Sequence, residues 1–347
     1  MIKIAIIACW FGPTYPNYFG LWLKSIAANS DINFFIFGDN KPLLPTPDNF
    51  HFSYITLQEF EKLTREKLRE PSVNIPFAYK VCDFKPMYGE IFADYLGKYD
   101  FWAHCDLDMI FGNIREFISD DVLNLYDKIY PNGHLSVYRN TQEVNQRWRI
   151  PDAKFNISLV LSRPINFAFD EWDGIYNIYM INNFPFYRNV DFLDPVPGTK
   201  RLRFIQRSNP KYERRQQDYT HQVFYWENGH FYRAYLNEQK QIITNSYVYM
   251  HFQKRRFPTP NDTLLTAPAF YCTPSGFVQK SSFGIPSYDD LLTFNPYPGK
   301  IYETWEAWWS RKKSKISRLM GKSVFAPKSL KLEGKSWQGN PNTAQKE

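Results

Sequence analysis

The chain has 347 residues, of which 44% are hydrophobic, and it carries a formal net charge of +7 at pH 7. This hydrophobic share is too high for an intrinsically disordered protein, and no apolar run approaches the roughly 20 residues that a membrane-spanning helix needs. The positive charge favours anionic partners, such as nucleoside diphosphates, nucleic acid or anionic lipid surfaces, without choosing between them. We therefore expect a globular protein with one large or two medium-sized domains.

The first ten residues and the cysteines bear on the cellular compartment. A lysine at position 3 precedes a short apolar run that ends in Trp10-Phe11-Gly12-Pro13, which is too short a run and too poor a cleavage site for a signal peptide. The four cysteines are widely scattered and show no Cys-x-x-Cys spacing. We expect them to be buried thiols in a reducing compartment, so the sequence favours a cytoplasmic protein.

The N-terminal part alternates short apolar stretches with an amphipathic one. Residues 4–9 read as a buried strand, residues 18–28 as a helix and residues 32–37 as a second strand. This β-α-β beginning predicts an α/β fold with a mainly parallel central sheet flanked by helices, in which ligands bind beyond the carboxyl ends of the strands.

Aromatic and acidic residues follow these two strands. Trp10 and Phe11 follow the first strand, and Asp39 follows the second. Because the carboxyl ends of parallel strands meet at one edge of a sheet, these side chains should line one crevice. Asp39 could hold a ribose or a base edge, or it could simply form the turn in which it lies.

Two lysines precede a predicted helix in the next part of the chain. Residues 57–69 have the spacing of an exposed helix, and a further helix should begin near Lys85-Pro86, where proline in the first turn costs little. Lys80 and Lys85 lie close to that helix start, where a lysine suits a phosphate group. The alternative is an ion pair between Lys80 and Asp83.

The strongest motif is Asp106-Leu107-Asp108. It follows residues 101–105, a short apolar run typical of a buried strand, and is itself followed by an apolar Met-Ile-Phe stretch. A bare Asp-x-Asp is common by chance and usually means solvated charge. Here the apolar flanks make unpaired carboxylates costly, so the pattern favours two oxygen ligands that share a divalent cation.

The second half of the chain contributes further candidates. We interpret residues 133–138 and 155–162 as strands, residues 170–183 and 216–226 as helices, and the basic residues 201–215 as a segment that covers the active site. His251 ends another predicted strand and Lys254 follows three residues later. A lone histidine is more often structural, but this pair could supply a third metal ligand and a diphosphate contact.

In this order, the motifs resemble bacterial GT-A-fold, DXD-containing glycosyltransferases of capsule, exopolysaccharide and lipopolysaccharide biosynthesis. The chain is most similar to the group that includes the lipopolysaccharide galactosyltransferases and glycogenin-like enzymes. The resemblance covers about residues 2–257 and rests on motif order rather than close identity. It departs from the galactosyltransferase pattern near His251, where the usual Gly and Pro-Trp neighbours are missing and Arg255-Arg256 stand instead.

The resemblance implies transfer of a sugar from a nucleotide sugar, with a UDP-sugar favoured, to a hydroxyl of a glycan acceptor. Asp106, Asp108 and His251 would hold Mn²⁺ or Mg²⁺ against the donor diphosphate, where the cation acts as a Lewis acid. Trp10, Phe11, Asp39, Asp106, Lys80 and Lys254 would contact the donor.

Asp218 would face the anomeric carbon or the acceptor hydroxyl, as a general base in an inverting enzyme or as a stabiliser of positive charge in a retaining one. It could equally be an exposed helix carboxylate. The competing functions are a non-catalytic carbohydrate-binding or scaffold protein and a metal-dependent sugar-phosphate transferase. No nucleic-acid-binding motif is visible.

The C-terminal region reads as an extension with its own character. Residues 302–322 predict a helix whose tryptophans, Trp305, Trp308 and Trp309, share much of one face and are accompanied by lysines and arginines. Such a helix suits an anionic membrane, although the tryptophans could also pack on the domain. We expect peripheral attachment at the inner face of a bacterial plasma membrane and a lipid-linked acceptor.

These features divide the chain into predicted parts. Residues 1–260 form a catalytic domain, with a nucleotide-sugar-binding half (1–115) and an acceptor and metal half (116–260). Residues 261–323 form the C-terminal extension, and residues 324–347 form a tail whose composition is typical of disorder.

Overall fold

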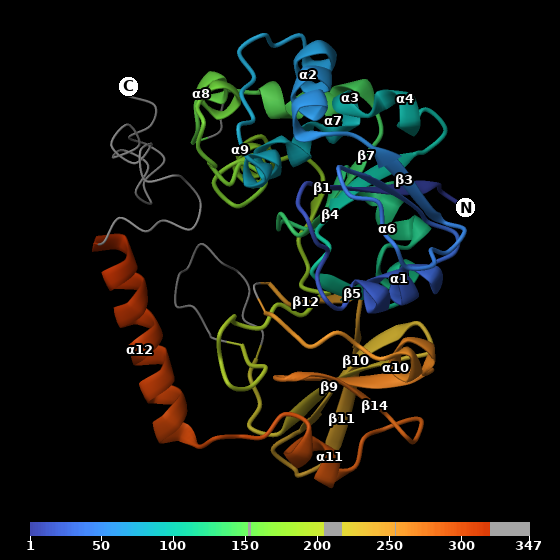
Figure 1. Ribbon diagram of the computed structural model, residues 1–347, viewed down its shortest axis with the longest axis vertical. Helices are drawn as coiled ribbons and strands as arrows, with labels where there is room; N and C mark the ends of the chain where they lie inside the picture. The colour runs from blue at the N-terminus through green and yellow to red at the C-terminus, as the bar shows by residue number, and fades with distance from the viewer. Residues whose placement is uncertain (152–153, 205–216, 254, 320–347) are drawn as a thin grey trace.

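The computed structural model describes residues 1–151, 154–204, 217–253 and 255–319, and its centre is a seven-stranded sheet (Figure 1). The strand order is β3-β2-β1-β4-β7-β6-β8. The strands are β1 (Ile4–Trp10), β2 (Asn33–Gly38), β3 (Phe50–Tyr54), β4 (Phe101–Cys105), β6 (Lys128–Ile129), β7 (Leu135–Arg139) and β8 (Phe186–Tyr187). β2 and β4 pair with the two sides of β1, and β3 pairs with β2, all in parallel. β7 runs antiparallel to β4. The expected mixed α/β fold with a mainly parallel sheet is confirmed.

Helices cover both faces of this sheet because side chains alternate along each strand. In β1, Ile4 and Ile6 pack with α1 (Phe19–Ala27) on one face, while Ala5 and Ile7 pack with α2 (Leu57–Leu68) on the other. The remaining helices near this sheet are η1 (Ala78–Met87), α3 (Tyr88–Ile91), α4 (Ala93–Leu96), α5 (Ile114–Phe117), α6 (Asp120–Leu125), α7 (Gln142–Gln146), η2 (Arg147–Arg149), α8 (Ile157–Ser162) and α9 (Ile175–Ile181).

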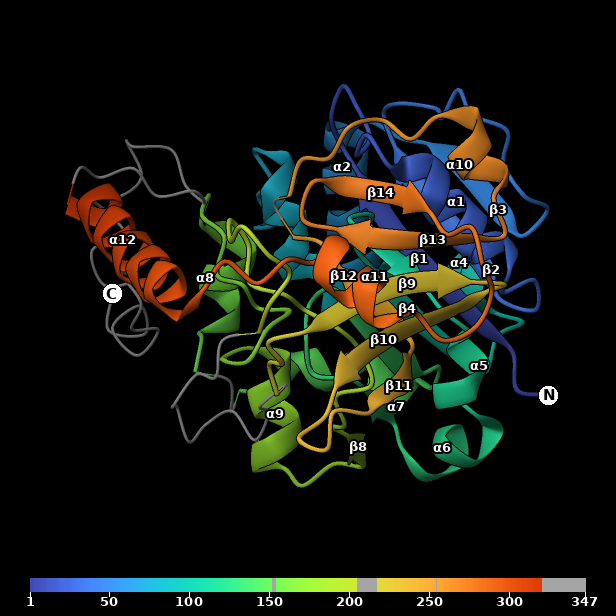
Figure 2. The ribbon, with the colours of Figure 1, turned by 90° about the horizontal axis from the view of Figure 1, so that it is seen from below.

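A second, antiparallel sheet lies below the first in Figure 1 and in front of β1 and β4 in Figure 2. Its order is β11-β10-β9-β13-β14. The strands are β9 (Gln222–Glu227), β10 (His230–Leu236), β11 (Ile242–Tyr247), β13 (Ala269–Thr273) and β14 (Gly276–Gln279), accompanied by α10 (Asp262–Thr266) and α11 (Tyr288–Thr293). Residue 260, where we expected the catalytic domain to end, lies between two strands of this one sheet.

A two-stranded ribbon of β5 (Met109–Phe111) and β12 (Tyr249–His251) joins the two sheets. The chain then ends its described part in α12 (Lys300–Leu319), which runs along one side of the molecule (Figure 1). A C-terminal helix was expected and is present. Among the described residues, no helix is long and apolar enough to cross a membrane.

Four local predictions differ from the structure. Residues 157–162 form α8 rather than a strand, because a short apolar run does not distinguish a strand from a buried helix. Residues 222–227 form β9 rather than part of a helix. The helix expected at Lys85-Pro86 begins only at Tyr88, and both residues belong to the 3-10 helix η1. The helix expected over residues 170–183 is shorter and spans Ile175–Ile181.

Candidate metal centre

The two carboxylates of the Asp-Leu-Asp motif lie directly beyond the end of β4. The Asp106 N–H donates to the His134 carbonyl at 2.9 Å, and the Asp108 carbonyl accepts from the Phe252 N–H at 2.8 Å. The loop is therefore tied to the segment before β7 on one side and to the residue after β12 on the other. These two bonds fix the backbone from which both carboxylates project.

The topology makes this edge of the sheet a natural binding crevice. From β1 the chain continues to β2 and β3 on one side, and β4 then pairs with the other side of β1. In open α/β sheets, ligands bind beyond the carboxyl ends of the strands at such a reversal of strand order. The ends of β1, at Trp10, and β4, at Cys105, flank this switch point.

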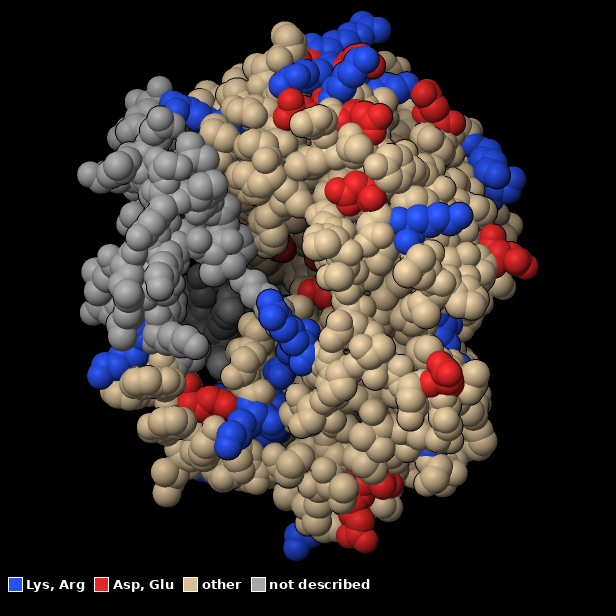
Figure 3. All heavy atoms as spheres, in the orientation of Figure 1, with Lys and Arg blue, Asp and Glu red and all other residues tan. Residues whose placement is uncertain are grey.

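His251 joins the carboxylates from 143 residues away in the chain. It ends β12 and pairs in register with Met109 of β5, the residue after Asp108. Its Nε2 lies 3.1 Å from Asp108 Oδ1, and each of Asp106, Asp108 and His251 offers one ligand atom within 4.8 Å of the others. Figure 3 shows acidic atoms at the floor of a hollow in the region where Figure 1 draws β5 and β12.

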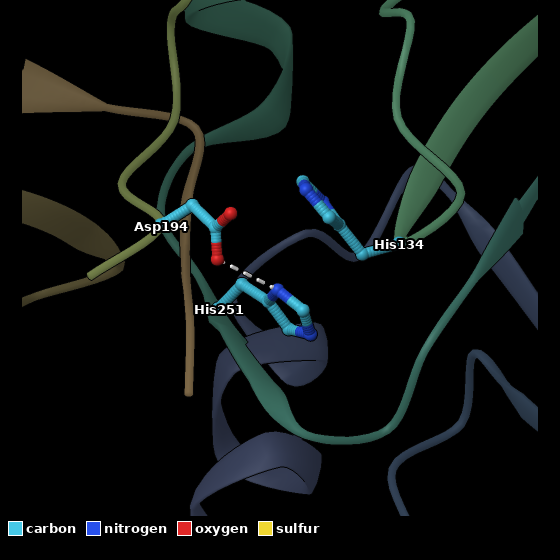
Figure 4. Close-up of side chains that lie close together, drawn as sticks. All are labelled: His134, Asp194 and His251. Atoms are coloured by element: carbon cyan, nitrogen blue, oxygen red, sulfur yellow. Dashed lines mark hydrogen bonds and ion pairs between the residues drawn. The ribbon is translucent and has the colours of Figure 1, made fainter. Parts of the chain in front are cut away.

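The opposite side of the His251 ring is held by Asp194. Asp194 Oδ1 lies 3.0 Å from His251 Nδ1, and the two side chains point toward each other in Figure 4. Burial alone would raise the pKa of Asp194, but its hydrogen bonds with His251 and Gln253 and the charge of His251 together outweigh burial, and the pKa falls to about 2. A histidine that ligates a metal commonly donates its other N–H to a carboxylate in this way.

The charge balance of the cluster suits a cation. Burial alone would lower the pKa of His251, but the Asp108 carboxylate beside it and the Asp194 carboxylate raise it well above its ordinary value. The imidazole therefore carries a positive charge between two carboxylates. A divalent cation with two carboxylate oxygens and one imidazole nitrogen would take over that charge and release the proton. The donor set fits Mn²⁺ or Mg²⁺.

His134 supports this arrangement from the other side. Figure 4 shows His134 beside His251 and Asp194. The two histidine rings stack with centroids 4.4 Å apart, and the three residues form a second group of possible ligands within 4.8 Å. His134 Nδ1 lies 2.6 Å from the Tyr249 hydroxyl and its Nε2 lies 2.8 Å from Asn132 Nδ2. Burial lowers the pKa of His134 to about 3. Because both ring nitrogens are engaged, His134 acts as a neutral support for His251.

Lys85 brings a positive charge to Asp106. Its Nζ lies 2.6 Å from Asp106 Oδ1, 3.2 Å from Asp170 Oδ2 and 2.9 Å from the Gly133 carbonyl. Burial alone would raise the pKa of Asp106, but the charges of Lys85 and His251 and the hydrogen bond from Lys85 together outweigh burial and lower that pKa. Burial instead dominates at Asp170, whose pKa rises to about 6, and at Glu171, whose pKa rises to about 8.

A sequence-family match covers residues 6–281, which includes the whole cluster. The chain belongs to DUF6625, a family of unknown function. No curated protein matches this DUF6625 chain.

Solved glycosyltransferase structures are similar to parts of this DUF6625 chain. GlyE of Streptococcus pneumoniae TIGR4 is 13% identical with a TM-score of 0.32, over 55% of this chain and 46% of GlyE. The galactosyltransferase LgtC is 11% identical with a TM-score of 0.34, over 55% of this chain and 76% of its own. Mouse xyloside xylosyltransferase 1 is 9% identical with a TM-score of 0.34, over 56% of this chain and 87% of the xylosyltransferase chain. The chain thus spans less than half of GlyE.

Two predicted site residues of the DUF6625 chain, Lys80 and Asp218, contact protein groups outside the metal cluster. Lys80 is fully buried, donates to Asp83 Oδ2 at 2.7 Å and to the Val160 carbonyl at 2.6 Å, and its ammonium has no free face for a phosphate. Asp218 forms an ion pair with Arg201 and accepts from the Phe204 N–H at 3.1 Å. Both side chains thus have protein partners, and their expected roles at the diphosphate and in catalysis stay predictions.

The other predicted donor contacts lie at the ends of β1 and β2. The Asp39 carboxylate accepts from the Gly12 N–H at 3.0 Å, so it shapes the loop after β1. The Trp10 ring stacks on Tyr15, and Phe11 packs near Phe60. Lys254 lies outside the described residues, as does most of the basic segment expected over the site.

Sequence reasoning missed four residues of the cluster. Lys85 was singled out only as a possible phosphate contact near a helix start, not as a partner of Asp106, and Asp170 only as the beginning of a helix. Asp194 and His134 carried no signal, since their partners lie far away in sequence. A motif scan limited to neighbouring residues could not have found them.

Proposed function

We propose that this chain is a metal-dependent glycosyltransferase that moves a sugar from a nucleotide sugar, with a UDP-sugar favoured, to a hydroxyl of a glycan acceptor. The observation that carries the proposal is the cluster of Asp106, Asp108 and His251 beyond the end of β4, beside the switch point of the sheet. A nucleotide in that crevice would bring its diphosphate to the cluster and its base toward Trp10, Phe11 and Asp39.

Asp106, Asp108 and His251 would hold Mn²⁺ or Mg²⁺, which supplies Lewis-acid stabilisation of the charge on a departing nucleoside diphosphate. The protein groups around them have separate tasks. Asp194 holds the His251 ring through Nδ1, so that Nε2 faces the carboxylates. Lys85 keeps Asp106 ionised through its contact at 2.6 Å. Because Asp106 would lie beside the donor diphosphate, we also propose that it contacts the donor.

Asp170 and Glu171 extend the site beyond Lys85. With a pKa of about 8, Glu171 keeps its proton at neutral pH, whereas Asp170, with a pKa of about 6, is mostly ionised there beside Lys85. A protonated carboxyl group donates one hydrogen bond and accepts others, which suits the hydroxyl groups of a sugar. We therefore assign the donor sugar to the side of the cluster where Lys85 lies.

The C-terminal helix supports a role at a membrane. Glu306 of α12 pairs with Arg203 at 3.0 Å, and Glu303 pairs with Arg201, so one face of the helix is tied to the protein. Trp305, Trp308 and Trp309 are each about half exposed. Exposed tryptophans beside a lysine-rich helix end suit an anionic bilayer.

This surface fits a lipid-linked acceptor in bacterial surface polysaccharide synthesis, with the protein at the cytoplasmic face of the membrane. Sedimentation with vesicles that contain 30% anionic lipid tests the attachment, and the variant with all three tryptophans replaced by alanine should lose it. Equal binding of both proteins would contradict this part of the proposal.

Hydrolysis of a panel of UDP-, GDP- and CMP-sugars, with and without Mn²⁺, tests the proposed reaction. We expect one donor to be hydrolysed only with metal, and Asp108→Asn to abolish this turnover. Asp94→Asn is the control, because Asp94 lies in an exposed pair with Lys67. Release of UMP from a UDP-sugar or GMP from a GDP-sugar, instead of the diphosphate, would indicate sugar-phosphate transfer. If no donor binds under any metal condition, the transferase proposal fails and a non-catalytic role remains.

A further inference from the structure

A second pocket opens on one face of the antiparallel sheet, with a volume of about 210 Å³. Its polar and aromatic lining comes from Gln217, Tyr219, Arg233, Tyr235, Asn245 and Tyr247. None of these residues belongs to the metal cluster. The volume is smaller than that of sites for drug-sized ligands and suits one ring-sized group.

The register of two strands creates this lining. Arg233 of β10 lies directly opposite Asn245 of β11 in an antiparallel pair. Residues two apart in a strand project from the same face, so Tyr235 and Tyr247 share the face of Arg233 and Asn245. Tyr219 completes the group from the loop before β9, and its ring stacks on Tyr235 with centroids 3.8 Å apart.

Arg233 is the fixed centre of the pocket. It is 3% exposed, and its Nη2 donates to the Gln217 carbonyl at 2.6 Å and to the Gln222 side chain. Its guanidinium lies over the Tyr219 ring, 4.6 Å from the centroid, and 5.4 Å from the centroid of Tyr235. Its Nε is buried and has no acceptor among the described residues. The tyrosine rings therefore pack on a guanidinium that protein hydrogen bonds already hold in place.

This combination suits a neutral sugar better than a phosphate. A pyranose presents C–H groups on a ring face that packs on aromatic rings, and hydroxyl groups at its edge that bond to amides. Exposed Gln217 and Asn245 supply such amides beside the partly exposed tyrosines. A phosphate would need exposed cationic donors, whereas Arg233, the one cation among the described lining residues, is 3% exposed and its Nη2 already serves two protein acceptors.

The pocket lies within reach of the metal cluster. Tyr247 precedes His251 by four residues, and at about 3.4 Å per residue their Cα atoms are at most about 14 Å apart. A short oligosaccharide could extend over this distance. We propose that the pocket binds a neutral pyranose unit of the acceptor glycan, remote from the hydroxyl that receives the sugar. The acceptor role rests on the proposed transferase function, but saccharide binding by the pocket does not.

Saturation-transfer NMR with the full chain tests this site without metal or nucleotide. The probes are methyl β-glucoside, methyl β-galactoside, methyl N-acetyl-β-glucosaminide, lactose and maltotetraose at millimolar concentration. At least one should bind to the wild type, and Tyr235→Ala and Asn245→Ala should each weaken that binding by about tenfold. Asn245 is exposed, so its variant should fold even if the tyrosine variant does not.

Tyr232→Ala is the matched control, since Tyr232 lies on the same strand but projects from the opposite face and stacks on Tyr225. It should bind the probe like the wild type. The proposal is overturned if none of the five probes binds, or if Tyr235→Ala and Asn245→Ala both bind as well as the wild type.

A parallel titration of the wild type with UDP and Mn²⁺ separates this inference from the proposed function. Saccharide binding without UDP binding would support the pocket and contradict a transferase that uses a UDP-sugar. UDP binding without binding of any saccharide probe would leave the transferase standing and overturn the pocket.

Discussion

The 3-10 helix η1 contributes to two lysine–aspartate pairs that differ in what surrounds them. Lys80 and Asp83, near its start, are both fully buried. Lys85, near its end, contacts Asp106, whose side chain is 33% exposed. The pairs have nearly the same N–O distance, 2.7 Å and 2.6 Å. What distinguishes a structural pair from a site pair is therefore access and neighbouring charge.

The buried pair cannot bind a ligand because protein donors occupy the acceptor positions of the Asp83 carboxylate. Asp83 accepts from Lys80 and from the N–H groups of Phe167, at 2.9 Å, and Phe169, at 3.0 Å. The open pair has a second carboxylate, Asp170, at 3.2 Å from the same ammonium, and the cluster of possible metal ligands lies on its other side. Substitutions should therefore affect stability at one pair and ligand binding at the other.

Asp83→Ala should produce the largest effect. It leaves a buried ammonium without its counter-charge and two buried N–H groups without acceptors, so we expect a loss of about 3–5 kcal/mol in the free energy of unfolding. Urea denaturation measures it. Asp94→Ala, which breaks an exposed pair with Lys67, should cost less than about 1 kcal/mol. Equal losses in the two variants would contradict the comparison.

Asp106→Asn should have the opposite profile. Lys85 keeps Asp170 and the Gly133 carbonyl as partners, so the free energy of unfolding should change by less than about 2 kcal/mol. Metal-dependent turnover of the nucleotide sugar should fall by about 100-fold or more, since a metal ligand is lost. Turnover within a factor of two of the wild type would show that Asp106 serves Lys85 alone.

Asp194→Asn tests the support behind His251. The amide cannot balance the imidazole charge or fix its tautomer as the carboxylate does, so Mn²⁺ affinity should fall by about 10–100-fold. Calorimetric titration of Mn²⁺ measures the affinity. Asp191 lies three residues earlier and bonds to the Tyr187 hydroxyl at 2.9 Å, so Asp191→Asn provides a matched control that should retain Mn²⁺ affinity. An unchanged affinity in Asp194→Asn would exclude this support role.

Glu171→Gln should have a smaller, pH-dependent effect. Burial and the nearby Asp170 carboxylate raise the pKa of Glu171 from 4.5 to about 8, so the stability that its protonated form contributes is lost as pH rises from 4.5 through 8. The glutamine variant does not ionise. It should match the wild type near pH 4.5 and exceed it by roughly 1–3 kcal/mol at pH 8. Parallel unfolding curves at both pH values test the sign.

Patterns that are local in sequence predicted much of the fold. The alternation of apolar strands and helices in residues 4–37 and the strand at residues 101–105 were right, because each segment is bounded by turn residues. Residues 157–162 were misassigned because their apolar run fits either a strand or a buried helix. β9 was misassigned because it pairs with β10 and β13, and these partner strands lie outside residues 216–226, for which a helix was predicted.

The residues of the candidate site likewise fall into those that local sequence patterns predict and those that only long-range packing brings together. Asp106, Asp108 and His251 could be predicted because each follows or ends an apolar strand. The partners of His251 could not, because Asp194 is brought there by a bridge between Leu193 and Met250. Lys80 and Lys85 look alike in sequence, and only their burial in the fold separates them. Long-range packing, rather than residue type, decides these cases.

Binding of Mn²⁺ tests the central claim most directly, and electron paramagnetic resonance of the free ion can follow it with and without UDP. We expect the wild type and Asp94→Asn to bind one Mn²⁺ ion, more tightly when UDP is present, and Asp108→Asn to bind none in the same range. Binding that persists in Asp108→Asn, or no binding by the wild type with UDP, would contradict a metal centre at the end of β4.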